Sequence, residues 1–306
     1  MIVTIHNDQL TLTADTLGAQ MQSITSYKGT EYLWNGDERY WKGRAPVLFP
    51  FVARLKDKTY TVNGGTYQMK IHGFASACEF EVAEQTESSV TFALRDNEVT
   101  RAQYPFAFLF KVRYALKENT VEVTYTVDNP EDEMLHFSLG GHPGFNVPLK
   151  EGTAFEDYYL RFSQPCEPDR VGFSSELLVS GTDKRYELED GRIIRLRHDL
   201  FDHDAIVLKN MAKSVTIASD KTKRYVTVSY PQMLYVGFWH AERKAAPFVG
   251  VWSKPGAGMA YVCVEPWVSL PARDGVIEDF ACKGDLIHLP GHGSYENTWY
   301  ITIGEE

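Results

Sequence analysis

The stretch Thr120–Val127, TVEVTYTV, decides the fold class because apolar and polar residues alternate in it without interruption. Alternation with a period of two is typical of a strand with one buried face, and β-branched and aromatic residues favour that conformation. Glu118-Asn119 separates this stretch from another alternating run, KVRYAL at Lys111–Leu116. The two runs therefore predict neighbouring strands joined by a tight turn.

The same pattern recurs along the chain at Ser89–Leu94 (SVTFAL), Tyr225–Tyr230 (YVTVSY) and Thr298–Ile303 (TWYITI). Turn residues separate further runs at Asn63-Gly64-Gly65 and Asp190-Gly191. Helical periodicity is rare, and only Ala272–Asp285 is expected to hold a turn or two of helix. Many short strands predict an all-β fold, one large antiparallel β-sandwich with few short helices. With no internal repeat and no linker-like segment, we expect a single domain over residues 1–306.

Composition excludes several classes of partner. The 306 residues include 31 Lys plus Arg against 41 Asp plus Glu, a formal net charge of -10, and no basic run interrupts this balance. Such a chain repels phosphate backbones and anionic lipid surfaces, so neither nucleic acid nor a membrane is an expected partner. We expect a monomer or a homodimer that acts on a small molecule.

Cysteine usage and the amino-terminal residues bear on the compartment. Cys78, Cys166, Cys263 and Cys282 are scattered and form no CxxC pair, which is typical of reduced thiols. The first residues, MIVTIHNDQLTL, lack the basic-then-apolar layout of a signal peptide. Apolar runs such as Met233–Trp239 are of strand length, far below the ~18 residues of a membrane span. We therefore expect a cytoplasmic location.

Two candidate binding residues lie in the first quarter of the chain. Arg54 lies in an otherwise apolar run, RAPVLFPFVARL, where a guanidinium needs a partner or a ligand. His72 directly precedes Gly73, whose missing side chain allows close approach to a ligand. The structural alternatives are a salt bridge that closes one end of the sandwich and a hydrogen-bonded, half-buried histidine.

Two further residues suit proton transfer. His142 lies in LGGHPGFNVP, whose glycines and prolines hold one imidazole on a tightly turned backbone, as a general acid requires. Glu265 ends the apolar run YVCVEPW, and a carboxyl group leaving a buried strand beside an indole should have a raised pKa, which suits a general base. The alternatives are a turn whose glycines only satisfy positive φ angles, and a rim carboxylate paired with Arg54.

A fifth candidate segment is LFDHDAIVL, in which Asp202, His203 and Asp204 precede an apolar strand. These side chains reach one ligand from the strand entrance, or they form a solvated turn. No phosphate-binding glycine loop and no GxSxG motif is present. His288 and His292 have HxxxH spacing, but Pro290 and Gly291 exclude the helix that would align them, so we expect no metal site. A reaction without cofactors, using one acid and one base, is the expected class.

Seven stretches together resemble the aldose 1-epimerase (galactose mutarotase-like) family, in its shorter bacterial branch. They are LGAQMQSI from Leu17, EYLWNGDERYWKGRAPVLFPFVARL from Glu31, KIHGFA from Lys70, LGGHPGFNVPL from Leu139, FDHDAIVL from Phe201, YVCVEPW from Tyr261 and LPGHGSYENTWYITI from Leu289. They span essentially the whole chain, and the HGF, GGHPGFN and EPW elements are specific in combination.

The resemblance implies the galactose mutarotase-like β-sandwich and cofactor-independent interconversion of the α and β anomers of a hexose. It implies that Arg54 and His72 bind sugar hydroxyls, that His142 donates a proton to the ring oxygen, and that Glu265 takes the proton of the anomeric hydroxyl. The sugar-holding aspartate of the family falls on Asp204 or Asp202, with Asp204 favoured. We expect His142 and Glu265 to face each other across about the width of a pyranose ring.

Two other functions remain open on this fold. A hexose-6-phosphate mutarotase needs cations at the pocket, and Lys42, Arg44 and Arg54 lie close together in the sequence. A non-catalytic sugar-binding or regulatory protein would bind sugar without accelerating its anomerisation.

Overall fold

The computed structural model describes residues 1–240 and 260–305, and the alternating stretches form strands in it as predicted. Thr120–Asp128 is strand β10, which pairs antiparallel with β9 (Leu109–Lys117) across the turn at Glu118-Asn119. Every second residue of β10 is buried, so its valines supply one face of the core.

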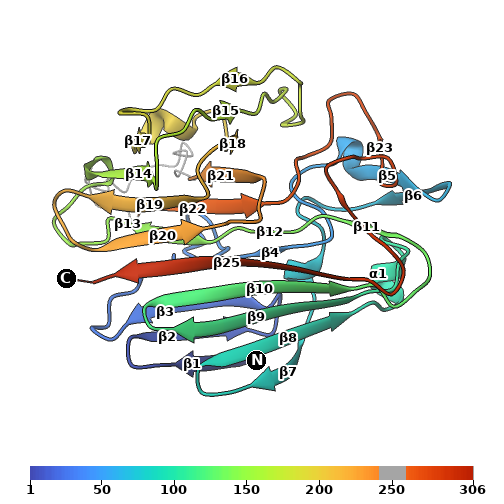
Figure 1. Cartoon of the computed structure of the whole chain (residues 1–306), viewed down its shortest axis with the longest axis horizontal. Coiled ribbons are helices and arrows are strands. Elements are labelled where there is room, and N and C mark those ends of the chain that lie inside the picture. The colour runs from blue at the N-terminus through green and yellow to red at the C-terminus, as the bar shows by residue number, and fades with distance from the viewer. Residues whose placement is uncertain (241–259, 306) are drawn as a thin grey trace, which may run out of the picture.

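The larger sheet runs through most of the predicted strands, and β25 lies in its middle between β20 and β10 (Figure 1). Among the described residues its order is β17 (Ile193–Arg195), β14 (Tyr158–Phe162), β19 (Ser214–Ser219), β20 (Tyr225–Ser229), β25 (Ser294–Gly304), β10, β9, β8 (Ser89–Arg95) and β7 (Glu81–Gln85).

The second large sheet contains shorter strands and carries the candidate site. Its order within the described ranges is β16 (Lys184–Arg185), β15 (Asp169–Arg170), β18 (Ile206–Lys209), β21 (Tyr235–Trp239), β22 (Ala260–Trp267), β12 (Gly140–Gly141) and β4 (Val47–Leu48), with β13 (Gly144–Val147) also paired to β22.

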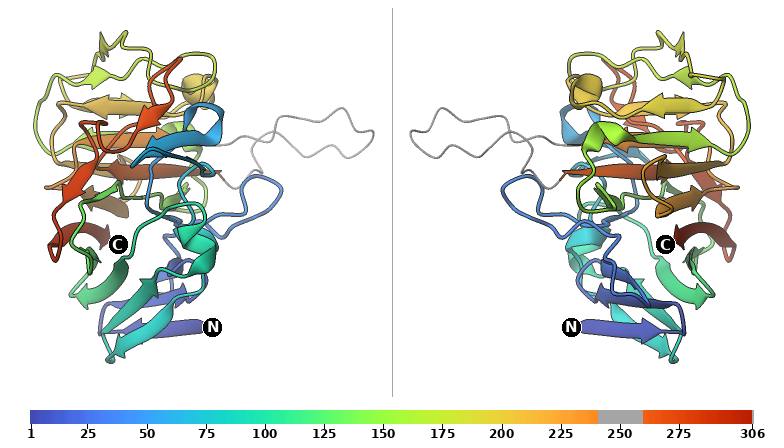
Figure 2. Two further views of the ribbon diagram at one scale, coloured as in Figure 1. Left: turned by 90° about the vertical axis from the view of Figure 1, so that its right-hand side faces the viewer. Right: turned by 90° about the vertical axis from the view of Figure 1, so that its left-hand side faces the viewer.

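Smaller sheets and single turns of helix complete the chain. The small sheets are β1 (Ile2–His6) with β2 (Leu10–Asp15) and β3 (Gln20–Ser26), β11 (Leu135–Phe137) with β24 (Ile287–Leu289), and β23 (Glu278–Asp279) with β5 (Thr59–Val62) and β6 (Gly65–Gln68). The helical turns are α1 (Glu98–Arg101) and the 3₁₀ segments η1 (Lys56–Lys58), η2 (Ala75–Ala77), η3 (Phe155–Asp157) and η4 (His198–Phe201). The strands β1–β3 lie at the opposite end of the molecule from β15, β16 and β18 (Figures 1 and 2).

The all-β, sandwich-like prediction is confirmed, and two details differ. The pairing of β23 with β5 is parallel. Residues 272–285 contain turns and β23 but no helix, because Pro271, Gly275 and Gly284 interrupt any helical repeat. No helix in the described part of the chain combines the length and apolarity needed to cross a bilayer.

Strand β22 has two different faces, and this positions the site. Val262 and Val264 belong to the main hydrophobic core, together with Trp299 and Ile301 of β25. Because successive side chains of a strand point to opposite faces, the odd-numbered residues lie on the side away from that core. They are Tyr261, Cys263, Glu265 and Trp267, all buried, and the three apolar ones belong to two smaller clusters apart from the main core.

Candidate active site

A cavity of ≈ 290 Å³ lies over the odd-numbered face of β22. Five of the six predicted site residues line it, namely Arg54, His72, His142, Asp204 and Glu265. Asp202 instead lines an adjoining cavity, to which Asp204 also contributes. The structure thus separates the two aspartates that the sequence left open, and Asp204 is the one placed beside the other candidates.

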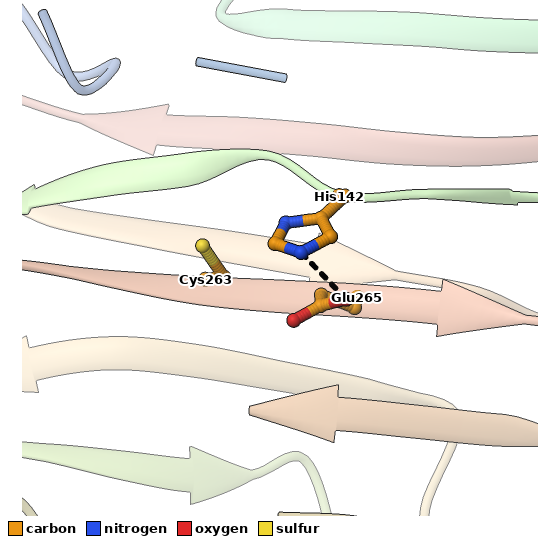
Figure 3. Close-up of side chains that lie close together, drawn as sticks. All are labelled: His142, Cys263 and Glu265. Carbon is orange, nitrogen blue, oxygen red and sulfur yellow. Dashed lines mark ion pairs between the residues drawn. The ribbon is translucent and has the colours of Figure 1, made fainter. Parts of the chain in front are cut away.

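His142 and Glu265 are in direct contact at the bottom of this cavity. The His142 Nε2 lies 3.2 Å from Glu265 Oε2, and the Glu265 side chain is only 2% exposed (Figure 3). The expectation that a pyranose width separates them is wrong. Leaving a buried carboxyl group without a partner is costly, and His142 supplies that partner for Glu265.

Burial acts on the two groups in opposite directions on the pKa scale, and both effects favour the uncharged forms. Desolvation, helped by the charge of nearby Asp204, raises the pKa of Glu265 well above its usual range, as the sequence predicted. Desolvation lowers the pKa of His142 to about 4. When the pair holds one proton, both shifts therefore place that proton mainly on Glu265.

The two glycines before His142 are required by packing rather than by backbone conformation. Neither Gly140 nor Gly141 has a positive φ angle in the structure. A Cβ on Gly140 would lie 2.8 Å from the Trp267 indole, and one on Gly141 would lie 2.7 Å from the Trp299 ring. The Gly-Gly pair therefore lets β12 pass between two indoles and brings His142 to Glu265.

His72 is fixed as a neutral hydrogen-bond donor. Its Nδ1 accepts a hydrogen bond from the backbone N–H of Ala53 at 3.2 Å, which leaves the proton of the neutral ring on Nε2. Burial, with His142 and Arg54 nearby, lowers the pKa of His72 well below its usual range. His72 has a φ of 66° and Gly73 a φ of 75°, so a left-handed turn presents this imidazole to the cavity.

Arg54 has an exposed side chain that lines the cavity. Within residues 1–240 and 260–305 its guanidinium forms neither an ion pair nor a hydrogen bond, and Glu265 pairs with His142 instead. The alternative of a structural salt bridge from Arg54 therefore has no support among the described contacts. A guanidinium free to donate is available to a ligand.

Three indoles surround the polar groups, and the sequence did not identify them as site residues. Trp41, Trp239 and Trp267 all line the cavity. The Trp41 ring centroid lies 4.9 Å from that of His142, and Trp239 meets the same imidazole edge-on at 5.7 Å. Aromatic residues recur throughout this chain as core residues, so no spacing distinguished these three.

Cys263 also approaches the acid–base pair from β22 (Figure 3). Donor atoms of His142, Cys263 and Glu265 lie within 4.8 Å of one another, a grouping that the sequence spacing gave no sign of. Burial and the neighbouring Glu265 raise the pKa of this thiol well above its usual range.

The cation cluster that the alternative function, a hexose-6-phosphate mutarotase, would need is not assembled at the cavity. Of Lys42, Arg44 and Arg54, only Arg54 lines it. The Arg44 guanidinium instead donates to the backbone carbonyl of Gln22 at 2.7 Å, a structural contact with β3.

Comparison with known proteins finds a matching family and a similar protein over most of the chain. The family described as Aldose 1-epimerase matches residues 1–276. Protein LacX (chromosomal) of Lactococcus lactis subsp. lactis is 33% identical over 269 residues, covering 85% of this chain and 89% of that protein.

Two solved structures show the same fold over the whole chain. A galactose mutarotase related enzyme from Lactobacillus acidophilus has a TM-score of 0.91 at 33% identity, covering 100% of this chain and 98% of that one. A galactose mutarotase-like protein from Lactobacillus casei has a TM-score of 0.87 at 29% identity, covering 99% and 100%. The resemblance and the galactose mutarotase-like fold are confirmed, and the chain belongs to the aldose 1-epimerase family.

Proposed function

We propose that this protein is a cofactor-independent aldose 1-epimerase that interconverts the α and β anomers of a hexose. The observation that supports this most is the buried contact of 3.2 Å between His142 and Glu265 within a cavity that also holds a free guanidinium and a neutral imidazole donor. Anomerisation needs one acid and one base and no redox group, which is what this pair offers.

The proton count of the pair matches the reaction. Ring opening removes a proton from O1, adds one to O5 and breaks the bond between C1 and O5. The pair enters with one proton, and its transfer from Glu265 to His142 creates the carboxylate base and the imidazolium acid. After ring opening the proton from O1 is on Glu265 and His142 is neutral. Rotation about C1–C2 and ring closure then run the same transfers in reverse.

The close contact of the pair fits the substrate better than a wide gap would. O1 and O5 are both bonded to C1, so the acid and the base must reach two neighbouring oxygens rather than opposite ends of a ring. A small separation of the two side chains is enough to admit both oxygens between them. His142 serves O5 and Glu265 serves O1 in this assignment.

The remaining lining residues hold the sugar. Arg54 and the Nε2–H of His72 donate hydrogen bonds to hydroxyl groups, and Asp204 accepts them. The indoles of Trp41 and Trp239 offer faces and edges against which the C–H groups of a pyranose pack. These groups orient the anomeric carbon toward His142 and Glu265.

Anomer equilibration tests the proposal. Freshly dissolved α-glucose and α-galactose are followed by polarimetry or NMR with the wild-type protein and with Glu265→Gln. We expect acceleration by the wild type and a loss of about 10²–10⁴-fold in turnover for the variant, with sugar binding retained, because glutamine keeps the shape of the side chain but cannot take a proton.

Two outcomes would contradict the proposal. Wild-type turnover in Glu265→Gln would remove Glu265 from the role of base. Sugar binding by the wild type without any rate above that of buffer would indicate a sugar-binding or regulatory protein instead.

A further inference from the structure

A second and larger cavity, of ≈ 890 Å³, adjoins the candidate active site. The two cavities share Phe173, Leu177, Asp204 and Trp239, so they adjoin at these four residues. The volume of the first cavity suits one sugar ring, whereas the proposed function assigns no ligand to the second cavity. Its wall includes β15 and β16, the two strands at one edge of the second large sheet, which together are called the ribbon below.

That ribbon presents two cations to the cavity. Arg170 of β15 is the direct cross-strand partner of Lys184 of β16, and both residues line the cavity wall. Like charges placed directly opposite each other in a sheet destabilise the pairing. In the described ranges neither side chain forms an ion pair or a hydrogen bond with an acidic group. This chain has a net charge of -10, so acidic partners were available in number.

The other face of the same ribbon shows the ordinary arrangement. The adjacent register pair is Asp169 opposite Arg185, with Arg185 Nε 3.6 Å from Asp169 Oδ1. Arg185 also contacts Glu167 at 2.9 Å. The ribbon therefore balances its charges on one face and leaves two cations unbalanced on the face toward the cavity. An anionic ligand at that position would supply the missing charge.

The larger cavity also contains two aspartates, of which Asp202 lines this cavity alone and Asp204 lines both cavities. Asp204 belongs to both cavities and lies close enough to Glu265 to raise its pKa, whereas Arg170 and Lys184 line only the larger cavity. His198 and His203 also line the larger cavity, and His198 pairs with Glu156 at 2.9 Å.

We infer that the larger cavity binds an anionic substituent, a phosphate monoester or a carboxylate, on a sugar whose anomeric carbon lies between His142 and Glu265. This inference rests on the proposed function and narrows its substrate class to charged sugars. Arg170 and Lys184 bind the anion, and Trp239 and Phe173 cover the part of the sugar that connects the two cavities.

The test compares neutral and charged sugars on matched variants. Anomerisation of glucose, glucose 6-phosphate and glucuronate is measured for the wild type, for the double variant Arg170→Gln/Lys184→Met, and for Arg185→Gln on the opposite face of the ribbon. We expect the wild type to prefer a charged sugar. The double variant should lower the ratio of kcat/KM for the charged over the neutral sugar by about 10- to 100-fold, and Arg185→Gln should not change it.

Equilibrium binding keeps this test separate from the proposed function. Calorimetric titration with glucose 6-phosphate, glucuronate, glucose and inorganic phosphate requires no turnover. Weaker binding of a charged sugar to the double variant than to the wild type supports the anion site even if no anomerisation is seen. Equal effects on charged and neutral sugars, or inorganic phosphate bound as tightly as the sugar phosphate, would overturn the inference. The two charged sugars distinguish a phosphate from a carboxylate.

Discussion

The contact between His142 and Glu265 shows how two buried residues can hold a single proton for use in both directions. Burial favours the neutral form of each residue, so the proton sits on the carboxyl group at rest. Because both oxygens that exchange protons belong to one carbon of the substrate, direct contact between acid and base serves the chemistry. The catalytic roles of His142 and Glu265 thus depend on how many protons the pair holds as well as on where the two side chains lie.

The pH dependence of activity follows from these shifts. The pKa of His142 is lowered to about 4, so the pair gains a second proton, and loses its base, only below about pH 4. The pKa of Glu265 is raised, so the pair keeps its last proton to a higher pH than an ordinary carboxyl group would, and the acid is lost only above that pH. We expect kcat/KM to be flat across neutral pH, with the acid limb near pH 4 rather than near 6.5. The measurement is the enzymatic rate at each pH after subtraction of the spontaneous rate.

An acid limb close to the ordinary histidine pKa would contradict this account. A reference for the comparison is Glu265→Gln, whose residual rate should lack the alkaline limb, because the group that loses its proton there has been removed.

Arg54 provides a test of binding against stability. Its side chain is exposed and forms no ion pair within the described parts of the chain, so Arg54→Ala should leave the melting temperature close to that of the wild type. One or two hydrogen bonds from a charged donor contribute about 1.5–3 kcal/mol each, so KM should rise by at least about tenfold. Steady-state kinetics and thermal denaturation on the same sample check both.

A large fall in melting temperature with unchanged KM would return Arg54 to a structural role. Arg44→Ala is the matched control, because Arg44 bonds the Gln22 carbonyl and lies outside the cavity, so its loss should lower stability rather than raise KM.

At the scale of elements, strand length decided what the sequence could predict. The runs that became β10, β8, β20 and β25 are long enough for alternation to be recognised. Strands β4, β12, β15 and β16 have two residues each, and no period can be read from two positions. For this reason the sequence could not predict that Arg170 and Lys184 lie opposite each other in the ribbon.

The candidate site residues also divide into features that the sequence could predict and features that it could not. His142 and Glu265 lie in segments dense in glycine, proline and aromatic residues, and the family resemblance supplied their expected roles. The direct contact between them and the separation of Asp202 from Asp204 depend on how loops cross a sheet. The structural alternative, in which the glycines before His142 only satisfy positive φ angles, does not hold for Gly140 and Gly141, which instead pack against the indoles of β22 and β25.

The turn that presents His72 allows a clean comparison of two glycines. Gly73 and Gly64 both have a φ of +75°, so alanine is strained equally at each. A Cβ on Gly73 would lie 2.2 Å from the Phe49 carbonyl oxygen, whereas one on Gly64 meets nothing within 4 Å. We expect Gly64→Ala to lower the free energy of unfolding by about 1 kcal/mol and to leave activity normal. Gly73→Ala should lose several-fold more stability and displace His72, raising KM.

Chemical denaturation and sugar kinetics on both variants give the answer. Equal losses of stability would mean that the backbone angle, and not the contact with Phe49, makes Gly73 necessary.

At the scale of the whole molecule, the larger sheet depends on one strand. Strand β25 pairs with β10 on one side and with β20 on the other. It therefore joins two groups of strands that share no other ladder in the described part of the chain. Proline in a central strand removes ladder hydrogen bonds that solvent cannot replace.

Two prolines test this dependence. Tyr300 in β25 is half-buried and has strand partners on both sides, whereas Glu84 in β7 is exposed and lies on an edge strand. We expect Tyr300→Pro to give little soluble, folded protein, a loss of at least about 3 kcal/mol, and Glu84→Pro to keep a cooperative thermal transition near that of the wild type. Circular dichroism melts of the soluble fraction check this. Similar losses in both variants would show that the two halves of the sheet are stable without β25.

The central place of β25 also has a consequence for how the chain reaches its native state. The strands on either side of it, β10 and β20, precede it by many residues, so both half-sheets can form while their inner edges still lack a partner. Open edges of this kind pair readily with the edges of other chains, and contacts between residues far apart in sequence close slowly. Intermolecular pairing at β10 and β20 therefore competes with the docking of β25. Yield on refolding should fall steeply with protein concentration.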